Sequence, residues 1–117
     1  MKFMLAIALF AICATGCKKE EAWGVQGFVG GTELHRICGS KSPVNRQECY
    51  FYILGVVDTQ NSVSTADDPW LCGEPKRHDI ANAVMGHLKA HPDQTSVAAA
   101  DIVWSAVDKA YGCKNKR

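Results

Sequence analysis

Cysteine is the residue type with the widest chemical range in this chain, because thiols bind metals, act as nucleophiles and form disulfides. Six cysteines occur in 117 residues, and four fall where the sequence pattern predicts a folded domain. These four, separated by 11, 23 and 41 residues, are Cys38, Cys49, Cys72 and Cys113. Zinc sites usually contain Cys-x-x-Cys pairs, and none occurs here. An even set without such pairs favours two disulfides over a metal site.

Histidine and carboxylate pairs give little sign of catalysis. His87 and His91 are four residues apart on a predicted helix, but the metalloprotease pattern needs Glu after the first His, where this chain has Leu88. We expect the two histidines to lie at the partly exposed end of that helix, without binding a metal. Adjacent Asp67 and Asp68 are typical of a turn, and neither a Gly-x-Ser-x-Gly motif nor a phosphate-binding glycine motif occurs. The sequence predicts no catalytic residue, no metal and no cofactor, and so a protein that is not an enzyme.

The N-terminal residues predict export. Lys2 is followed by an apolar run over residues 3–12, which is too short to span a bilayer as a stable helix. Small residues then precede Cys17, as in bacterial lipoprotein signals; ordinary cleavage would instead leave Cys17 as a spare thiol. We expect residues 1–16 to be removed and Cys17 to be lipidated. The protein would then lie in the periplasm, anchored through lipid to a bacterial membrane.

Charge and composition divide the remaining chain. Residues 17–27 are predicted to be a charged tether, residues 28–113 a helical domain and residues 114–117 a basic tail. The whole chain has 13 basic and 12 acidic side chains, so loss of Lys2 leaves 12 of each. This balance gives no reason to expect a nucleic-acid partner.

The domain is organised around the apolar run 49–58, in which five residues share one face at helical spacing. Its aromatic and β-branched residues also suit a strand, but Ser42 followed by Pro43 is a typical helix start. We predict a helix over about residues 43–59 that is apolar around most of its circumference and buried at the centre of the domain. A close helix crossing would explain Gly55 within it.

Three further helices are predicted beside it. A short helix of about two turns follows Thr32, which can cap it. Another runs from Pro75 to His91, and the last begins within residues 93–96 and ends at Gly112. The fold class is therefore all-α, a small four-helix disulfide-bonded domain after a signal peptide. The predicted core consists of Leu34, Ile37, Tyr52, Ile53, Val56, Val57, Ile80, Val84, Leu88, Val103, Trp104 and Val107.

The positions of the predicted helices distinguish among the three pairings that four cysteines allow. In an antiparallel helix pair the start of the third helix lies near the end of the fourth, which brings Cys72 close to Cys113. Cys38 ends the first helix, and Cys49 lies two turns into the second across a short connection. We predict the pairs Cys38–Cys49 and Cys72–Cys113.

Several segments together resemble the Rap/Tai immunity-protein family: a helix ending in Cys38, then "CYFYILGVVD", Cys72 with Pro75 nearby, "VMGHLKAHP" and "DIVWSAVDKAYGC". The resemblance covers about residues 28–113. It departs from the family pattern at Gly112, where proline is common, and in the longer spacing between Cys72 and Pro75. The resemblance implies a periplasmic helical protein of type VI secretion that neutralises a peptidoglycan amidase effector, and it implies a homodimer.

The resemblance therefore predicts a protein that binds and blocks an amidase without chemistry of its own. The alternative is a periplasmic lipoprotein with a structural, chaperone-like or adaptor role on the same scaffold. An inhibitor of a cleft needs a protruding element, and residues 58–71 form the longest connection in the sequence. We expect Asp67, Asp68 and Trp70 to contact the partner. The other possibility is that Trp70 and Leu71 fold back onto the core.

Overall fold

The structure, a computed structural model, describes residues 28–116. The expected signal peptide, the tether and the lipidation site at Cys17 lie outside the described residues. Within residues 28–116 the chain forms four α-helices and a C-terminal 3-10 helix, with no β-strand: α1 (Gly31–Cys38), α2 (Pro43–Ser62), α3 (Arg77–Ala90), α4 (Ala99–Tyr111) and η1 (Cys113–Lys116). The prediction of a four-helix all-α domain is confirmed, and η1 includes most of the expected basic tail.

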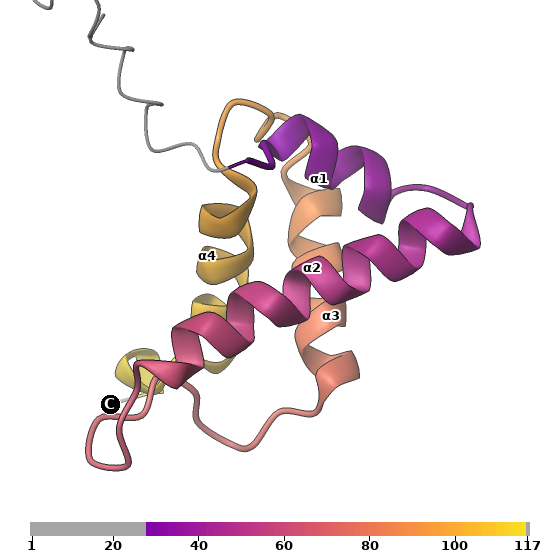
Figure 1. Ribbon diagram of the computed structural model, residues 1–117. Helices are drawn as coiled ribbons and strands as arrows, with labels where there is room; N and C mark the ends of the chain where they lie inside the picture. The colour runs from indigo at the N-terminus through magenta and orange to yellow at the C-terminus, as the bar shows by residue number, and fades with distance from the viewer. Residues whose placement is uncertain (1–27, 117) are drawn as a thin grey trace, which may run out of the picture.

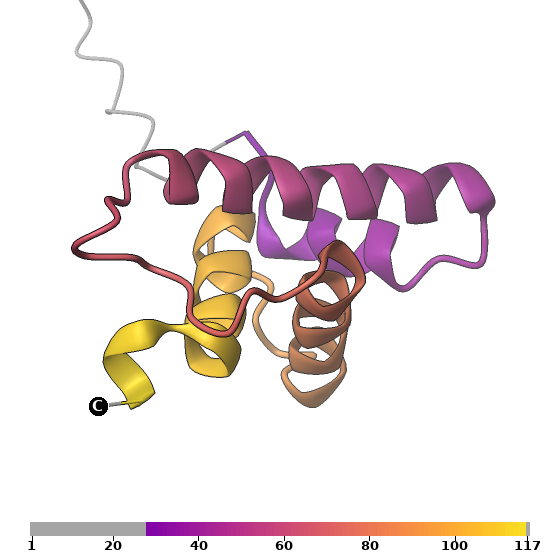
Figure 2. The same ribbon diagram turned by 90° about the horizontal axis from the view of Figure 1, so that it is seen from below.

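Helices α3 and α4 lie side by side, and α2 crosses over both of them (Figure 1). After a quarter turn, α2 runs along one side of the molecule, and the other three helices lie together against it (Figure 2). Each of α1, α3 and α4 contacts α2. The longest helix, α2, thus packs against the other three helices on one side only and is not surrounded by them.

This position of α2 corrects the expectation of a buried central helix. Its buried residues are Cys49, Ile53 and Val57, which are spaced four apart and form one narrow stripe. Phe51 is 60% exposed. Gly55 is also exposed, and a Cβ added there would meet no atom within 4 Å, so no close crossing explains the glycine. A helix that packs on one side only buries one stripe, although apolar residues lie around most of this one.

The core lies where the four helices meet. Nine of the twelve predicted core residues are buried: Leu34, Ile37, Ile53, Val57, Ile80, Val84, Leu88, Val103 and Val107. Tyr52 and Val56 are half-buried, and Trp104 is 42% exposed. The buried stripe of α4 is centred on Ala99, Ile102, Val103, Ala106 and Val107. Trp104 follows Val103 by one residue, a rotation of about 100°, and therefore falls outside this stripe.

Contacts between segments move two helix starts away from their predicted positions. The segment before α4 does not extend that helix, because its carbonyls accept hydrogen bonds from the first turn of α1. Gly31 N–H donates to Val97 O at 2.8 Å, and Thr32 N–H donates to Thr95 O at 3.2 Å. Consequently α4 begins at Ala99 rather than within residues 93–96. Thr32 lies inside α1 and does not cap it, because the N-cap residue is Gly30.

Helix α3 begins at Arg77 rather than at Pro75. Its N-cap residue is Lys76, whose backbone N–H donates to the Asp79 carboxylate at 2.9 Å. The side chain three residues into the helix therefore fixes the start of α3. At its N-terminal end, α2 has Ser42 as its N-cap residue and Pro43 in its first turn, as predicted.

Two disulfides join segments of the domain to one another. Cys38 is bonded to Cys49, which joins the end of α1 to α2. Cys72 is bonded to Cys113, which joins the connection after α2 to the residue that follows Gly112. These are the two pairs expected from the predicted helix ends. Backbone hydrogen bonds from Cys72 to Tyr111 and from Cys113 to Trp70 flank the second bridge.

Candidate partner-binding face

The connection between α2 and α3 returns to the helical body at Trp70. The Trp70 indole N–H donates to the Asp108 carboxylate at 3.0 Å, and its ring stacks on Trp104 with the centroids 6.5 Å apart and the planes at 5°. Trp70 and Leu71 are half-buried against the core, whereas Asp67 and Asp68 are exposed. Of the two possibilities for Trp70, the structure shows the one in which it folds back onto the domain.

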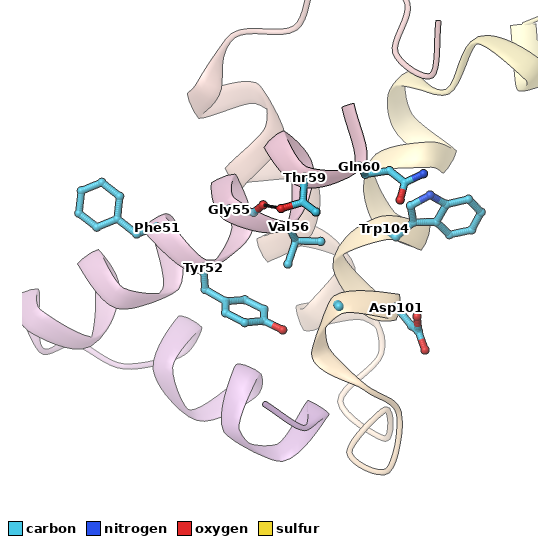
Figure 3. A pocket seen from close by; sticks show the side chains of 9 residues that line it. Phe51, Tyr52, Gly55, Val56, Thr59, Gln60, Asp101 and Trp104 are labelled. Carbon is cyan, nitrogen blue, oxygen red and sulfur yellow. Dashed lines mark hydrogen bonds between the residues drawn. The ribbon is translucent and has the colours of Figure 1, made fainter. Parts of the chain in front are cut away.

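A groove of about 570 Å³ lies beside this stack, between α2 and α4. We call it the α2–α4 groove; its walls include Phe51, Tyr52, Val56 and Gln60 from α2, and Asp101 and Trp104 from α4. Tyr52 projects from α2 toward α4, while Phe51 points away from α4 at the far end (Figure 3). Gln60 and Trp104 close the other end. Phe51 and Trp104 are thus two exposed aromatic side chains at opposite ends of the groove.

A second hollow of about 230 Å³ adjoins the first and shares Gln60 and Trp104 with it. Its lining includes Asp68 from the long connection and Lys114 from η1, whose side chains are 4.0 Å apart. Trp104 therefore stands between the groove and the hollow. The structure places two of the predicted partner-binding residues, Asp68 and Trp70, in the lining of the hollow that adjoins the α2–α4 groove.

Aromatic side chains half-exposed around a hollow are typical of protein contact surfaces, because Trp, Tyr and Phe are enriched where binding energy concentrates. Phe51 is 60% and Trp104 42% exposed at the α2–α4 groove. Neither residue is among the contact residues predicted from the sequence. The sequence pattern predicts Trp104 in the core and Phe51 in a buried helix. The signal for Phe51 was its position off the apolar stripe of its helix, whereas the sequence pattern contains no such signal for Trp104.

The groove is electrostatically one-sided. Asp101 is the charged side chain in its lining, and no Lys, Arg or His lines it. Burial raises the pKa of the Tyr52 hydroxyl above its ordinary value, and the negative charge of Asp101 raises it further. The phenol is therefore neutral at physiological pH and lies close enough to Asp101 to be influenced by its charge.

Another hollow, of about 480 Å³, lies between α2 and α3. Arg46, Tyr50, His78 and Asn82 are among its lining residues, together with the Cys38–Cys49 bridge. Its polar side chains are mixed, and none of the large apolar side chains that the described residues leave exposed lies in it. The α2–α4 groove therefore has the stronger character of a contact surface.

The histidines of α3 take part in local contacts. The rings of His87 and His91 stack with centroids 4.1 Å apart, and His91 Nδ1 lies 2.9 Å from His87 O. His87 Nε2 lies 2.8 Å from the Gln94 side-chain oxygen.

Among residues 28–116 no group of three or more His, Cys, Asp or Glu side chains is placed to hold a metal ion. The same residues include no helix both long and apolar enough to cross a membrane.

Comparison with known proteins identifies the domain. Searches of curated proteins and of solved structures find no match to this chain. The sequence profile of the Rap1a immunity proteins matches residues 30–113, which include all four α-helices and both disulfides. That range is most of the chain and agrees with the resemblance seen in the sequence. The chain belongs to the family of Rap1a immunity proteins.

Proposed function

We propose that this protein binds a peptidoglycan amidase delivered by type VI secretion and blocks its active site in the periplasm. The observation that carries the proposal is the family match over residues 30–113, because it covers the folded domain from the first helix to the last cysteine. Blocking needs only a stable complementary surface. The protein then acts by occlusion, without a catalytic group or a cofactor of its own.

The proposed contact surface is the α2–α4 groove together with the exposed part of the long connection. Three features support it: the exposed rings of Phe51 and Trp104, the adjoining hollow, and the carboxylate of Asp68 in the lining of that hollow. The neighbouring Asp67 is also exposed. Aromatic centres with polar rims are the usual composition of specific interfaces. In this arrangement Trp70 stacks on Trp104 and holds its ring in position, and makes little contact with the partner itself.

The proposed setting follows from the N-terminal sequence. Residues 1–16 would direct export, Cys17 would carry the lipid, and residues 17–27 would link the anchor to the domain. Removal of residues 1–16 and lipidation of Cys17 are testable together, because each changes the mass of the mature N-terminus. Mass spectrometry of the membrane fraction should find an acylated Cys17, whereas a mature soluble protein that starts elsewhere would contradict the anchor.

Inhibition of a purified amidase tests the proposed function. The enzyme is assayed on peptidoglycan with increasing amounts of the 28–116 domain, and stoichiometric inhibition is expected. Asp67→Ala, Asp68→Ala and Trp70→Ala should weaken inhibition, whereas Val44→Ala is the matched control because Val44 is 72% exposed and lines none of the hollows described. Failure of the wild-type domain to inhibit the amidase encoded beside its own gene would contradict the proposal.

A further inference from the structure

Asp101 is the one charged side chain in the lining of the α2–α4 groove. Asp101 presents an exposed carboxylate. The Thr59 hydroxyl donates its proton to Gly55 O at 2.8 Å and is therefore engaged within α2. No cationic side chain lines the groove to neutralise Asp101. The groove thus has a carboxylate facing solvent and no basic partner among its own residues.

An aromatic ring lies beside this carboxylate. Asp101 and Trp104 are three residues apart on α4, and such residues are neighbours on a helix surface. Trp70 stacks on Trp104 and holds its ring in place, while Trp104 keeps 42% of its surface exposed. The floor between the helices is apolar, with Val56 and the Tyr52 ring half-buried. A carboxylate, an indole held in place and an apolar floor therefore meet within one groove.

This combination fits one kind of group. Arg and Lys have long apolar stems and a charged head, so they can lie along an apolar floor while the head meets a carboxylate. Their cations are also attracted to the face of an indole, most strongly for tryptophan. A purely apolar side chain would bury Asp101 without a partner, and an acidic side chain would be repelled by it. The groove therefore selects for a basic side chain.

We infer that the α2–α4 groove receives an Arg or Lys side chain of the effector, whose charged head pairs with Asp101 and whose stem lies against Trp104. The inference rests on the proposed function, because it names the chemistry of the effector's contact point. An arginine would suit the site best, since its planar guanidinium can stack on the indole and bond a carboxylate with two N–H groups at once.

Binding measurements between the intact protein and a purified amidase test the inference. Asp101→Asn should weaken binding about tenfold or more, as expected when a central charged contact is lost. The same change should reduce the dependence of affinity on salt, because an ion pair is screened. Trp104→Leu should also weaken binding, and Trp104→Phe should restore part of the loss. Glu48→Gln is the matched control, since Glu48 is an exposed acid on α2 that lines none of the hollows described.

The variants also separate the possible outcomes. Asp101 and Trp104 are exposed, so thermal unfolding should show that both variants fold. If wild type inhibits the amidase and Asp101→Asn binds as tightly as Glu48→Gln, the inference is wrong while the proposed function stands. If wild type does not bind, both are wrong. If sedimentation shows that Trp104→Leu only dissociates a homodimer, the groove joins two copies of this chain and the inference is overturned.

A charge swap gives the strongest test. Asp101→Lys should abolish tight binding, because two cations would then face each other. Exchange of the matching Arg or Lys of the amidase for Glu should restore part of the affinity to Asp101→Lys and to no variant that keeps Asp101. Scanning the basic residues around the amidase cleft identifies that partner, and the absence of any rescuing position would contradict the inference.

Discussion

Trp70 shows how a residue in an exposed connection can have mainly a structural role. Its indole N–H bonds to Asp108, its ring stacks on Trp104, and its backbone carbonyl accepts from Cys113 N–H at 2.9 Å. Three kinds of contact thus converge on one side chain and its backbone. The residue fixes the point at which the connection stops being exposed and becomes part of the domain.

Substitutions of Trp70 should separate the ring from its hydrogen bond. Trp70→Phe keeps an aromatic ring but loses the donor to Asp108, and should lower the free energy of unfolding by about 1 kcal/mol. Trp70→Ala also loses the stack and should cost about 2–3 kcal/mol, below the range for fully buried tryptophan because this side chain is half-buried. Urea denaturation measures both. Equal losses for the two variants would show that the ring contributes nothing.

Tyr52 should make stability depend on pH in the alkaline range. Burial, and secondarily the charge of Asp101, raise the pKa of its hydroxyl above the ordinary value of 10.0. The unfolded chain then releases this proton at lower pH than the folded protein does, so unfolding is favoured once pH exceeds 10.0. The stabilisation is complete below that pH and is lost as pH rises through the folded-state pKa. Tyr52→Phe should flatten this decline, as measured by urea denaturation between neutral and alkaline pH.

At the scale of single elements, α2 shows the difference between apolar and buried. Ile53 has no exposed surface, whereas Val56, one turn further along, is half-buried at the α2–α4 groove. Ile53→Asp should prevent folding, because the carboxylate would be buried without a partner. Val56→Asp should leave a folded domain that is less stable, since its side chain can reach solvent at the groove. Circular dichroism and thermal melts distinguish the two outcomes.

Glycines in the helices have different roles. A Cβ at Gly31 would clash with the Gln94 carbonyl and lie 2.9 Å from Val97 O, so only glycine lets the segment before α4 approach α1. Around Gly86 in α3 there is nothing within 4 Å. Gly86→Ala should stabilise the domain by about 0.5–1 kcal/mol, because alanine favours the helical backbone. Gly31→Ala should destabilise it. Equal shifts in melting temperature would contradict the packing described for Gly31.

At the scale of the whole molecule, the two disulfides should contribute unequally. Their cysteines are 11 and 41 residues apart in sequence. From the entropy of closing loops in the unfolded chain, we expect about 3 kcal/mol for Cys38–Cys49 and about 4 kcal/mol for Cys72–Cys113. Replacing each pair by serine and measuring unfolding checks the order. A larger loss from the shorter bridge would show that the unfolded chain is not the main site of the effect.

Much of this architecture follows from short-range patterns in the sequence. Helical spacing predicted four helices, and the expected helix ends predicted both disulfide pairs. Spacing shows which residues share a face, but it does not show which neighbour covers that face. For this reason the predictions that α2 is buried at the centre and that Trp104 lies in the core were wrong. The start of α4 was also displaced, because a carbonyl such as Val97 O is used by α1, and that contact joins segments more than sixty residues apart in the chain.

The candidate contact surface was less predictable than the fold. The long connection drew attention to Asp67, Asp68 and Trp70, whose role in binding stays a prediction. The α2–α4 groove was missed because it depends on the packing of two helices against each other. No pattern within either helix reveals that Tyr52 and Asp101 line the same groove. Once the helices pack, the negative charge of Asp101 raises the pKa of the Tyr52 hydroxyl.

The order of the cysteines has a consequence for how the molecule can be divided. One bridge joins Cys38 to Cys49 and the other joins Cys72 to Cys113, so the two covalent loops neither overlap nor interlock. The segment between α2 and Trp70 is then the sole covalent link between the two halves of the folded domain. A single protease cut among its exposed residues, such as Asp67, would release two fragments, each closed by its own disulfide. Such halves could be produced separately and would reassemble only through the packing of α1 and α2 on α3 and α4, as in a fragment-complementation pair.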